Sequence, residues 1–257
     1  MATVLLVYWR QLRKIQAYRE LHVEKLIYPL WKSSDQDADT LLEVLLEAGA
    51  GLAEQPGVRA LRLAVADSAV APGAHRRMGA TTPLPDGMLS VWMDRAGDRT
   101  VVEDALQDRV ERWHCYLVTE AEPIVNTLHP ASPGQRVHGM CHVVFLQRPP
   151  RLSEEQWLSI WQDSHTQVAI DTQSTFGYRQ NVIVRGLSYA APPLHAMIEE
   201  NFPPEAMSSN YAFYAVEEGD EAGMQANAKA MLDSVSRFID FDRIDVIPMS
   251  EYLLKSL

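Results

Sequence analysis

The sequence predicts an α+β fold made of two β-α-β-β-α-β units in tandem, and three observations predict it. Strand-like runs alternate with amphipathic stretches in both halves of the 257-residue chain. A stretch with two prolines and a glycine, residues 126–136, falls almost at the midpoint and is typical of a linker. Two short patterns recur in both halves. The order of elements is that of the split, ferredoxin-like unit. We therefore expect an N-terminal half at 1–125 and a C-terminal half at 137–257.

The composition excludes several classes of partner. The chain has 23 basic and 34 acidic residues and a net charge of −11, whereas nucleic acids and anionic membranes attract basic surfaces. The apolar run Val4–Trp9 is too short to span a bilayer and has no basic segment before it. Cys115 and Cys141 alone give neither a disulfide framework nor a cysteine-rich zinc site. We expect a cytoplasmic protein.

The C-terminal half shows its elements most clearly. Met140–Gln147 is rich in Val and Phe, which indicates a strand, and Pro149 and Pro150 follow it. Ser153 with Gln156 three residues later has the spacing of a capping box and predicts the start of a helix. The later elements are expected as strands at Phe176–Val184, Tyr211–Val216 and Ile244–Pro248, a loop at Ser188–Ser209 and a helical stripe from Met224 to Phe238.

The N-terminal half follows the same order of elements but contains one more helical segment than the β-α-β-β-α-β unit needs. Strands are expected at Thr3–Trp9, Val58–Ala66, Met88–Met93 and His114–Thr119, a loop at Asp67–Gly87 and a helix at Val101–Val110. Both Leu12–Leu30 and Thr40–Ala53 have helical periodicity, although the unit needs a single helix there. One of the two is an insertion, and the sequence does not decide which.

Two short matches relate the halves. The residues from Tyr18 to His22 and from Trp161 to His165 share the pattern aromatic, any, acid, any, His. Glu122 and Glu251 lie in similar contexts near the ends of the two halves, where we expect both to have structural roles. A repeat longer than 100 residues indicates duplicated domains.

The C-terminal half resembles the EthD-like family of dimeric α+β barrels over about Met140 to Ile247. The resemblance rests on the run Val143-Val-Phe-Leu-Gln-Arg-Pro-Pro-Arg-Leu-Ser-Glu-Glu-Gln-Trp, on Trp161-Gln-Asp-Ser-His165 and on Phe176-Gly-Tyr-Arg-Gln-Asn181. The family's His-Ala-Pro is His165-Thr-Gln here, and the N-terminal half lacks Tyr-x-Gln-Asn. The resemblance implies a barrel of two sheets, normally formed by a homodimer, and similarity to small cofactor-free enzymes that act on hydrophobic, often aromatic molecules.

His165 is the leading candidate for catalysis. Trp157, Trp161 and His165 share one apolar helix face, so we expect the imidazole to point inward. A neutral imidazole in a cavity can act as a general base, and a buried structural histidine is the alternative. Tyr178 could stabilise a developing oxyanion or simply belong to the core. Gln180 shares its strand face with Tyr178, whereas Asn181 takes the other face.

Other polar residues are weaker candidates. If the repeat is real, Tyr18 and His22 mark a second or degenerate site. His138 and His142 lack a third ligand at a suitable spacing, so we expect no metal site. Asp163 lies on a solvated helix face. Arg76 lies in a loop, where a solvated side chain is expected over a contact with an anionic substrate.

These observations predict a cofactor-independent, lyase-type acid/base enzyme, such as a dehydratase, decarboxylase or C–C lyase. Its substrate would be a small hydrophobic or aromatic compound of catabolism or secondary metabolism. His165 would move the proton and Tyr178 would stabilise negative charge. Substrate contacts are expected from Trp161, Asn181, Gln180, His22 and Tyr18. The alternatives are a non-catalytic small-molecule-binding or accessory protein of a degradation pathway and, third, a barrel that binds haem through a histidine.

Overall fold

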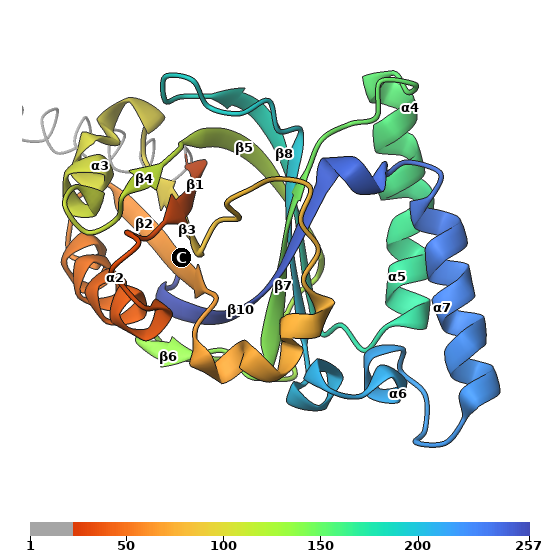
Figure 1. Ribbon diagram of the computed structural model, residues 1–257. Coiled ribbons are helices and arrows are strands. Elements are labelled where there is room, and N and C mark those ends of the chain that lie inside the picture. Colours follow the sequence, from red (N-terminus) through yellow and green to blue (C-terminus); the bar gives the residue numbers. More distant parts are fainter. Residues whose placement is uncertain (1–22) are drawn as a thin grey trace, which may run out of the picture.

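Eight antiparallel strands close into a barrel (Figure 1) in the computed structural model, which describes residues 23–257. Their order is β2-β3-β1-β5-β8-β9-β7-β10, and β10 pairs back with β2. Closure of the ring leaves no long unpaired sheet edge. The barrel strands are β1 (Glu24–Trp31), β2 (Val58–Val65), β3 (Gly87–Met93), β5 (Tyr116–Ile124), β7 (Met140–Leu146), β8 (Gly177–Gly186), β9 (Ala196–Phe202) and β10 (Ile244–Lys255). The short β4 (Arg112–Trp113) pairs with β1, and β6 (Gln135–Arg136) pairs with β10. The predicted α+β class is confirmed.

Each half of the chain supplies four strands to the ring. In both halves, the order around the ring is the second, third, first and fourth of these strands as numbered along the chain. Helices cover the outside of the barrel in two groups (Figure 1). The helices α2 (Ala38–Ala53) and α3 (Thr100–Leu106) pack against the N-terminal strands. The C-terminal strands carry α4 (Glu154–Leu158), the π-helical η3 (Ser159–His165), α5 (Thr166–Thr172) and α7 (Glu221–Val235). The shorter pieces are η1 (Ser68–Arg76), η2 (Ala96–Asp98), η4 (Pro204–Met207), α6 (Asn210–Phe213) and η5 (Phe241–Arg243).

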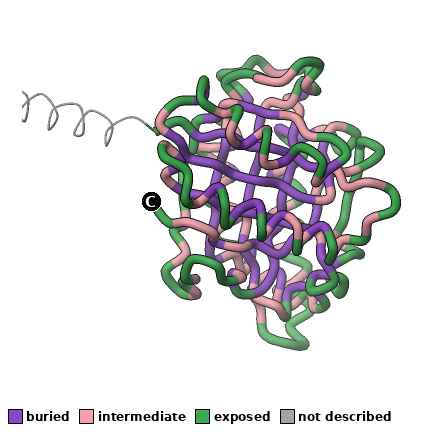
Figure 2. Tube along the Cα trace, turned by 90° about the vertical axis from the view of Figure 1, so that its left-hand side faces the viewer, coloured by how far each residue is buried: buried purple, intermediate pink, exposed green. Residues whose placement is uncertain are grey.

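Alternation along the strands divides the apolar residues between the barrel interior and the helix layers. Val143 and Phe145 belong to the interior cluster, whereas Val144 and Leu146 pack under the helices of the C-terminal half. The strands are therefore buried on both faces over much of their length (Figure 2).

One part of the barrel interior is filled by charged residues. Arg179 lies within ion-pair distance of Glu199 (3.2 Å), Glu251 (2.5 Å) and Glu122 (3.8 Å). Lys25 pairs with Glu199 at 3.2 Å. Burial of a carboxylate is tolerated only when a cation or hydrogen bonds compensate it. The contacts of Glu122 and Glu251 with Arg179 give both glutamates a structural role.

The N-terminal part of the chain corrects two predictions. Glu24–Trp31 is strand β1, so the helix predicted over Leu12–Leu30 is wrong from Glu24 onward. Six consecutive residues of β1 are buried, because one face meets the barrel interior and the other meets the helices. A strand buried on both faces loses its period of two and resembles a helix in sequence. The predicted strand Thr3–Trp9 lies outside the described residues. Thr40–Ala53 falls within α2.

The predicted strand Tyr211–Val216 is also wrong. This segment contains most of α6, which begins after Ser209, whose hydroxyl accepts a hydrogen bond from the Ala212 N–H. The actual strand is β9, inside the loop predicted at Ser188–Ser209. Three consecutive polar residues of β9, Glu199–Asn201, hide its apolar alternation. No helix within residues 23–257 has the length and apolar character needed to cross a membrane.

Candidate functional site

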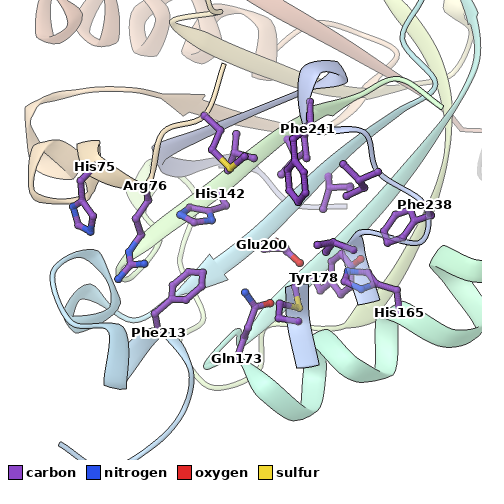
Figure 3. A pocket seen from close by; sticks show the side chains of 18 residues that line it. His75, Arg76, His142, His165, Gln173, Tyr178, Glu200, Phe213, Phe238 and Phe241 are labelled. Carbon is purple, nitrogen blue, oxygen red and sulfur yellow. The ribbon is translucent and has the colours of Figure 1, made fainter. Parts of the chain in front are cut away.

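A cavity of about 350 Å³ lies between the sheet of the C-terminal half and its helix layer (Figure 3). Its size falls in the range of small-molecule sites. Side chains of β7, β8, β9 and β10 line one side, and Met231 and Val235 of α7 line the other. Most of the lining is apolar or aromatic, including Phe213, Phe238 and Phe241. The cavity therefore suits a hydrophobic ligand.

Three titratable side chains form a row across the strands that line this cavity. Glu200 of β9 lies directly opposite His142 of β7 and opposite Tyr178 of β8. All three line the cavity (Figure 3), because directly opposite residues project from the same face of an antiparallel sheet. The sequence analysis did not identify Glu200.

Glu200 is half-buried and makes no ion pair or side-chain hydrogen bond within the part of the chain that the structure describes. Burial penalises its charged form and raises the pKa of its carboxyl to about 7. A carboxyl with this pKa exchanges a proton near neutral pH, which is the property required of a general base or acid.

Tyr178 is buried beside this carboxyl. The indole Nε1–H of Trp161 donates a hydrogen bond of 3.0 Å to the Tyr178 hydroxyl oxygen. Burial, followed by the charge of Glu200, raises the pKa of the Tyr178 phenol well above its usual value. The phenol therefore keeps its proton at neutral pH and can act as a hydrogen-bond donor.

His165 lies on the helix side of the cavity at the end of the π-helical segment. As predicted, its face of the helix is buried, together with Trp157 and Trp161. The His165 Nδ1 lies 3.0 Å from the Ser234 hydroxyl of α7, and its ring packs against Phe238 at 4.8 Å. Burial, followed by the nearby Arg237, lowers the pKa of His165 to about 4. The imidazole is therefore neutral at pH 7.

The other predicted contact residues take different positions. Gln180 donates to the Thr166 hydroxyl at 2.7 Å. Asn181 lies on the other face of the strand, as predicted, and donates inside the barrel to the Met197 carbonyl and to Glu199. Neither residue lines the cavity. Tyr18 and His22 lie outside the described residues. Asp163 is exposed, as expected.

His142 and Arg76 have surroundings that the sequence analysis did not foresee. The His142 Nε2 is shielded from solvent and has no hydrogen-bond partner among residues 23–257. Burial, followed by the Arg76 charge, lowers the pKa of His142 to about 3. Arg76 is not the freely solvated side chain expected from its loop. It donates to the Ala206 carbonyl at 2.7 Å and its guanidinium lies 4.3 Å from the Phe213 ring centroid.

The sequence contained a partial indication of His142 and none of Glu200. The spacing of His138 and His142 was noted only for metal binding, and no cluster of three or more potential metal ligands is found among the described residues. His138 instead packs against His129, with the ring centroids 4.2 Å apart and the rings tilted relative to each other. Glu200 could have been found only by recognising β9, because its pairing with two other strands defines the row.

No protein family and no curated protein sequence matches this chain. Among solved structures, the chain is similar to an anthrone oxidase-like protein, with a TM-score of 0.54 and 8% identity over 91% of this chain and 94% of that one. Chlorite dismutase from Candidatus Nitrospira defluvii, in a variant form, gives a TM-score of 0.45 and 10% identity over 90% and 92% of the two chains. The first likeness supports the dimeric α+β barrel type of fold. The finer resemblance to the EthD-like family is not confirmed by these matches.

Proposed function

We propose that this protein is a cofactor-independent acid/base enzyme that acts on a small hydrophobic, aromatic compound. The observation that carries this proposal is Glu200, a carboxyl in a largely apolar cavity that has no ion-pair partner among residues 23–257. Such a carboxyl has little use in stability, because burial of an uncompensated charge is costly. The energetic cost of burying Glu200 is explained if its carboxylate takes up a proton from a bound ligand.

In this proposal Glu200 removes a proton from the substrate and Tyr178 donates a hydrogen bond to the oxygen that gains negative charge. The position of Tyr178 opposite Glu200 supports this division of roles. The Trp161 indole fixes the phenol by donating to its oxygen, so the phenolic proton remains free for the substrate. His165, neutral and held by Ser234, orients the substrate from the helix side.

This assignment moves the general base from His165 to Glu200. A base works best when its pKa is close to the working pH. The Glu200 pKa of about 7 meets that condition, whereas an imidazole with a pKa of about 4 is a weak proton acceptor. Removal of a proton next to a carbonyl is the first step of a dehydration by β-elimination, which is one of the lyase-type reactions expected from the sequence.

We further propose that the two halves are tandem ferredoxin-like units, with boundaries near 125 and 137, and that the chain forms homodimers. The same spatial order of strands in both halves supports the first part. The internal pairing of β5 with β8 and of β10 with β2 closes the ring within one chain. A dimer would therefore use an outer surface of the barrel and not its strand edges.

Hydrogen exchange tests the proposed chemistry without knowledge of the natural substrate. The protein is incubated in D₂O with anthrone or acetophenone, two aromatic ketones with exchangeable C–H bonds, and deuterium uptake is followed by NMR. We expect uptake above the protein-free rate, with a loss on the order of 10²-fold or more in Glu200→Gln. Binding of both ketones without enhanced exchange would favour the alternative, a non-catalytic binding or accessory protein.

The second candidate function is haem binding through His165. One observation favours it: the Nδ1 contact with Ser234 is the kind of bond that orients a ligating imidazole. His165 would hold the haem, which would supply redox chemistry when bound. An absorption spectrum with a Soret band that disappears in His165→Ala would support this function and contradict the cofactor-free proposal.

A further inference from the structure

A second cavity, of about 170 Å³, lies on the barrel-interior face of the sheet and shares no lining residue with the first. Alternate residues of the same strands line the two cavities. Phe145 and Asp245 line the second, whereas Val144 and Ile244 line the first. The segment before β3 bounds this second cavity, where the Trp31 Nε1–H donates to the Pro83 carbonyl at 3.0 Å.

Arg112 gives this cavity a positive charge. The register of β4 places Arg112 opposite Trp31, and its guanidinium carbon lies 4.1 Å from the Trp31 ring centroid. No carboxylate lies within ion-pair distance of Arg112 in residues 23–257. A guanidinium held over an aromatic ring by a cation–π contact still has N–H groups available for a carboxylate.

His114 adds a second polar group to the same lining. Its Nδ1 is shielded from solvent and has no hydrogen-bond partner in the described chain. Its ring meets Trp31 edge to face, with centroids 5.6 Å apart. Burial, followed by Arg112, lowers the pKa of His114, so the neutral imidazole can donate one N–H. A buried polar atom without a partner is costly unless a ligand or water satisfies it.

The rest of the lining is compatible with an aromatic anion. Prolines, Tyr116 and Phe145 supply most of the wall. Asp245 also lines the cavity, but its carboxylate accepts hydrogen bonds from the Ala80 and Thr81 N–H groups and from the Thr81 hydroxyl, at 2.7, 2.9 and 2.6 Å. The Tyr116 hydroxyl donates to the Pro192 carbonyl.

From this arrangement we propose that the second cavity binds a small aromatic carboxylic acid in its anionic form. The carboxylate would accept hydrogen bonds from the Arg112 guanidinium and the His114 N–H, and the ring would lie between Phe145 and the prolines that line the cavity. The volume is below the usual range for drug-sized ligands, which limits the ligand to about a single ring. The site is distinct from the proposed catalytic cavity and does not depend on its function.

Calorimetric titration of the whole protein with sodium benzoate tests this site, with benzamide as a neutral compound of nearly the same shape. We expect saturable benzoate binding, and roughly 10- to 100-fold weaker binding in Arg112→Gln, the usual effect of losing a hydrogen bond to a charged group. The matched control is Arg95→Gln, which removes the same charge from an exposed position outside the cavity lining. It should bind benzoate as the wild type does.

The affinity for benzoate should also be unchanged in Glu200→Gln, because that residue lines the other cavity. Three results would overturn the proposal: benzamide that binds as tightly as benzoate, Arg112→Gln that retains wild-type affinity, or Glu200→Gln that binds benzoate more tightly. The last result would place benzoate in the first cavity, where loss of the carboxylate charge would favour an anion.

Discussion

At the scale of single residues, Glu200 and His165 illustrate how burial, as the main cause, shifts the pKa values of two candidate bases in opposite directions. Both line the same cavity, yet desolvation raises the pKa of the carboxyl to about 7, whereas desolvation, followed by the Arg237 charge, lowers that of the imidazole to about 4. Each group is thereby driven toward its neutral form. The pKa of the carboxyl lies near neutral pH, where a small change in its surroundings changes its protonation.

Glu200→Gln should change how stability depends on pH. Between about pH 4.5 and 7 the folded protein keeps the Glu200 proton whereas the unfolded chain loses it, so Glu200 makes the wild type less stable as pH rises. The variant lacks this contribution. The free energy of unfolding of the variant, measured by urea denaturation, should therefore rise relative to that of the wild type as the pH increases across this interval. The difference between the two should become constant above pH 7. A constant difference across the interval would contradict the raised pKa.

His165→Ala should affect stability and substrate binding more than turnover. It removes the contact with the Ser234 hydroxyl and the packing against Phe238, at a cost of about 1–3 kcal/mol and several degrees of melting temperature. With a substrate in hand, KM should rise while kcat falls less than in Glu200→Gln. A larger loss of kcat in His165→Ala than in Glu200→Gln would make the imidazole the base.

At the scale of elements, the reliable sequence signals were local and the missed ones came from tertiary structure. The capping box at Ser153 and Gln156 forms as predicted, because its two hydrogen bonds depend on four residues only. Strand β1 was missed because both of its faces are buried, and β9 because the barrel places Glu199 and Asn201 among compensating charges. The π-helical form of Ser159–His165 has no signature that periodicity could reveal.

Ser153→Ala should destabilise the protein by about 1 kcal/mol, the usual cost of losing an N-cap. The Ser153 hydroxyl accepts from the Gln156 N–H at 3.2 Å at the start of the helix that leads to His165. Ser159→Ala is the matched control, since Ser159 is an exposed helical residue and its side chain makes no capping bond. Chemical denaturation that finds equal stability in the two variants would show that the cap contributes nothing.

At the scale of the whole molecule, the closed ring and its charged interior make the two halves interdependent. Arg179 comes from β8, whereas its partner Glu122 comes from β5 of the other half. The Arg179 guanidinium contributes to lowering the pKa values of Glu199 and Glu251 despite their burial. The sequence predicted the helix-facing cavity in outline through His165 and Tyr178, but pairing between distant strands decides which other residues join it.

Arg179→Met should destabilise the protein by about 3–5 kcal/mol, because Glu199 and Glu251 would lose a buried cation. Both carboxyls have lowered pKa values in the folded protein, so their stabilising contribution is present above about pH 4.5 and is lost as pH falls. The variant should therefore lose less stability on acidification. Arg151→Met, which breaks a more exposed pair with Asp240, should cost about 1 kcal/mol or less.

The central claim is that Glu200 is a proton acceptor tuned to neutral pH in an apolar cavity. Carbon-13 NMR of the side-chain carboxyls measures this directly, with Glu200→Gln identifying the resonance. We expect that resonance to titrate with a midpoint near 7, far above an exposed glutamate. A midpoint near 4.5 would show that the cavity does not tune this carboxyl, and would contradict its assignment as the general base.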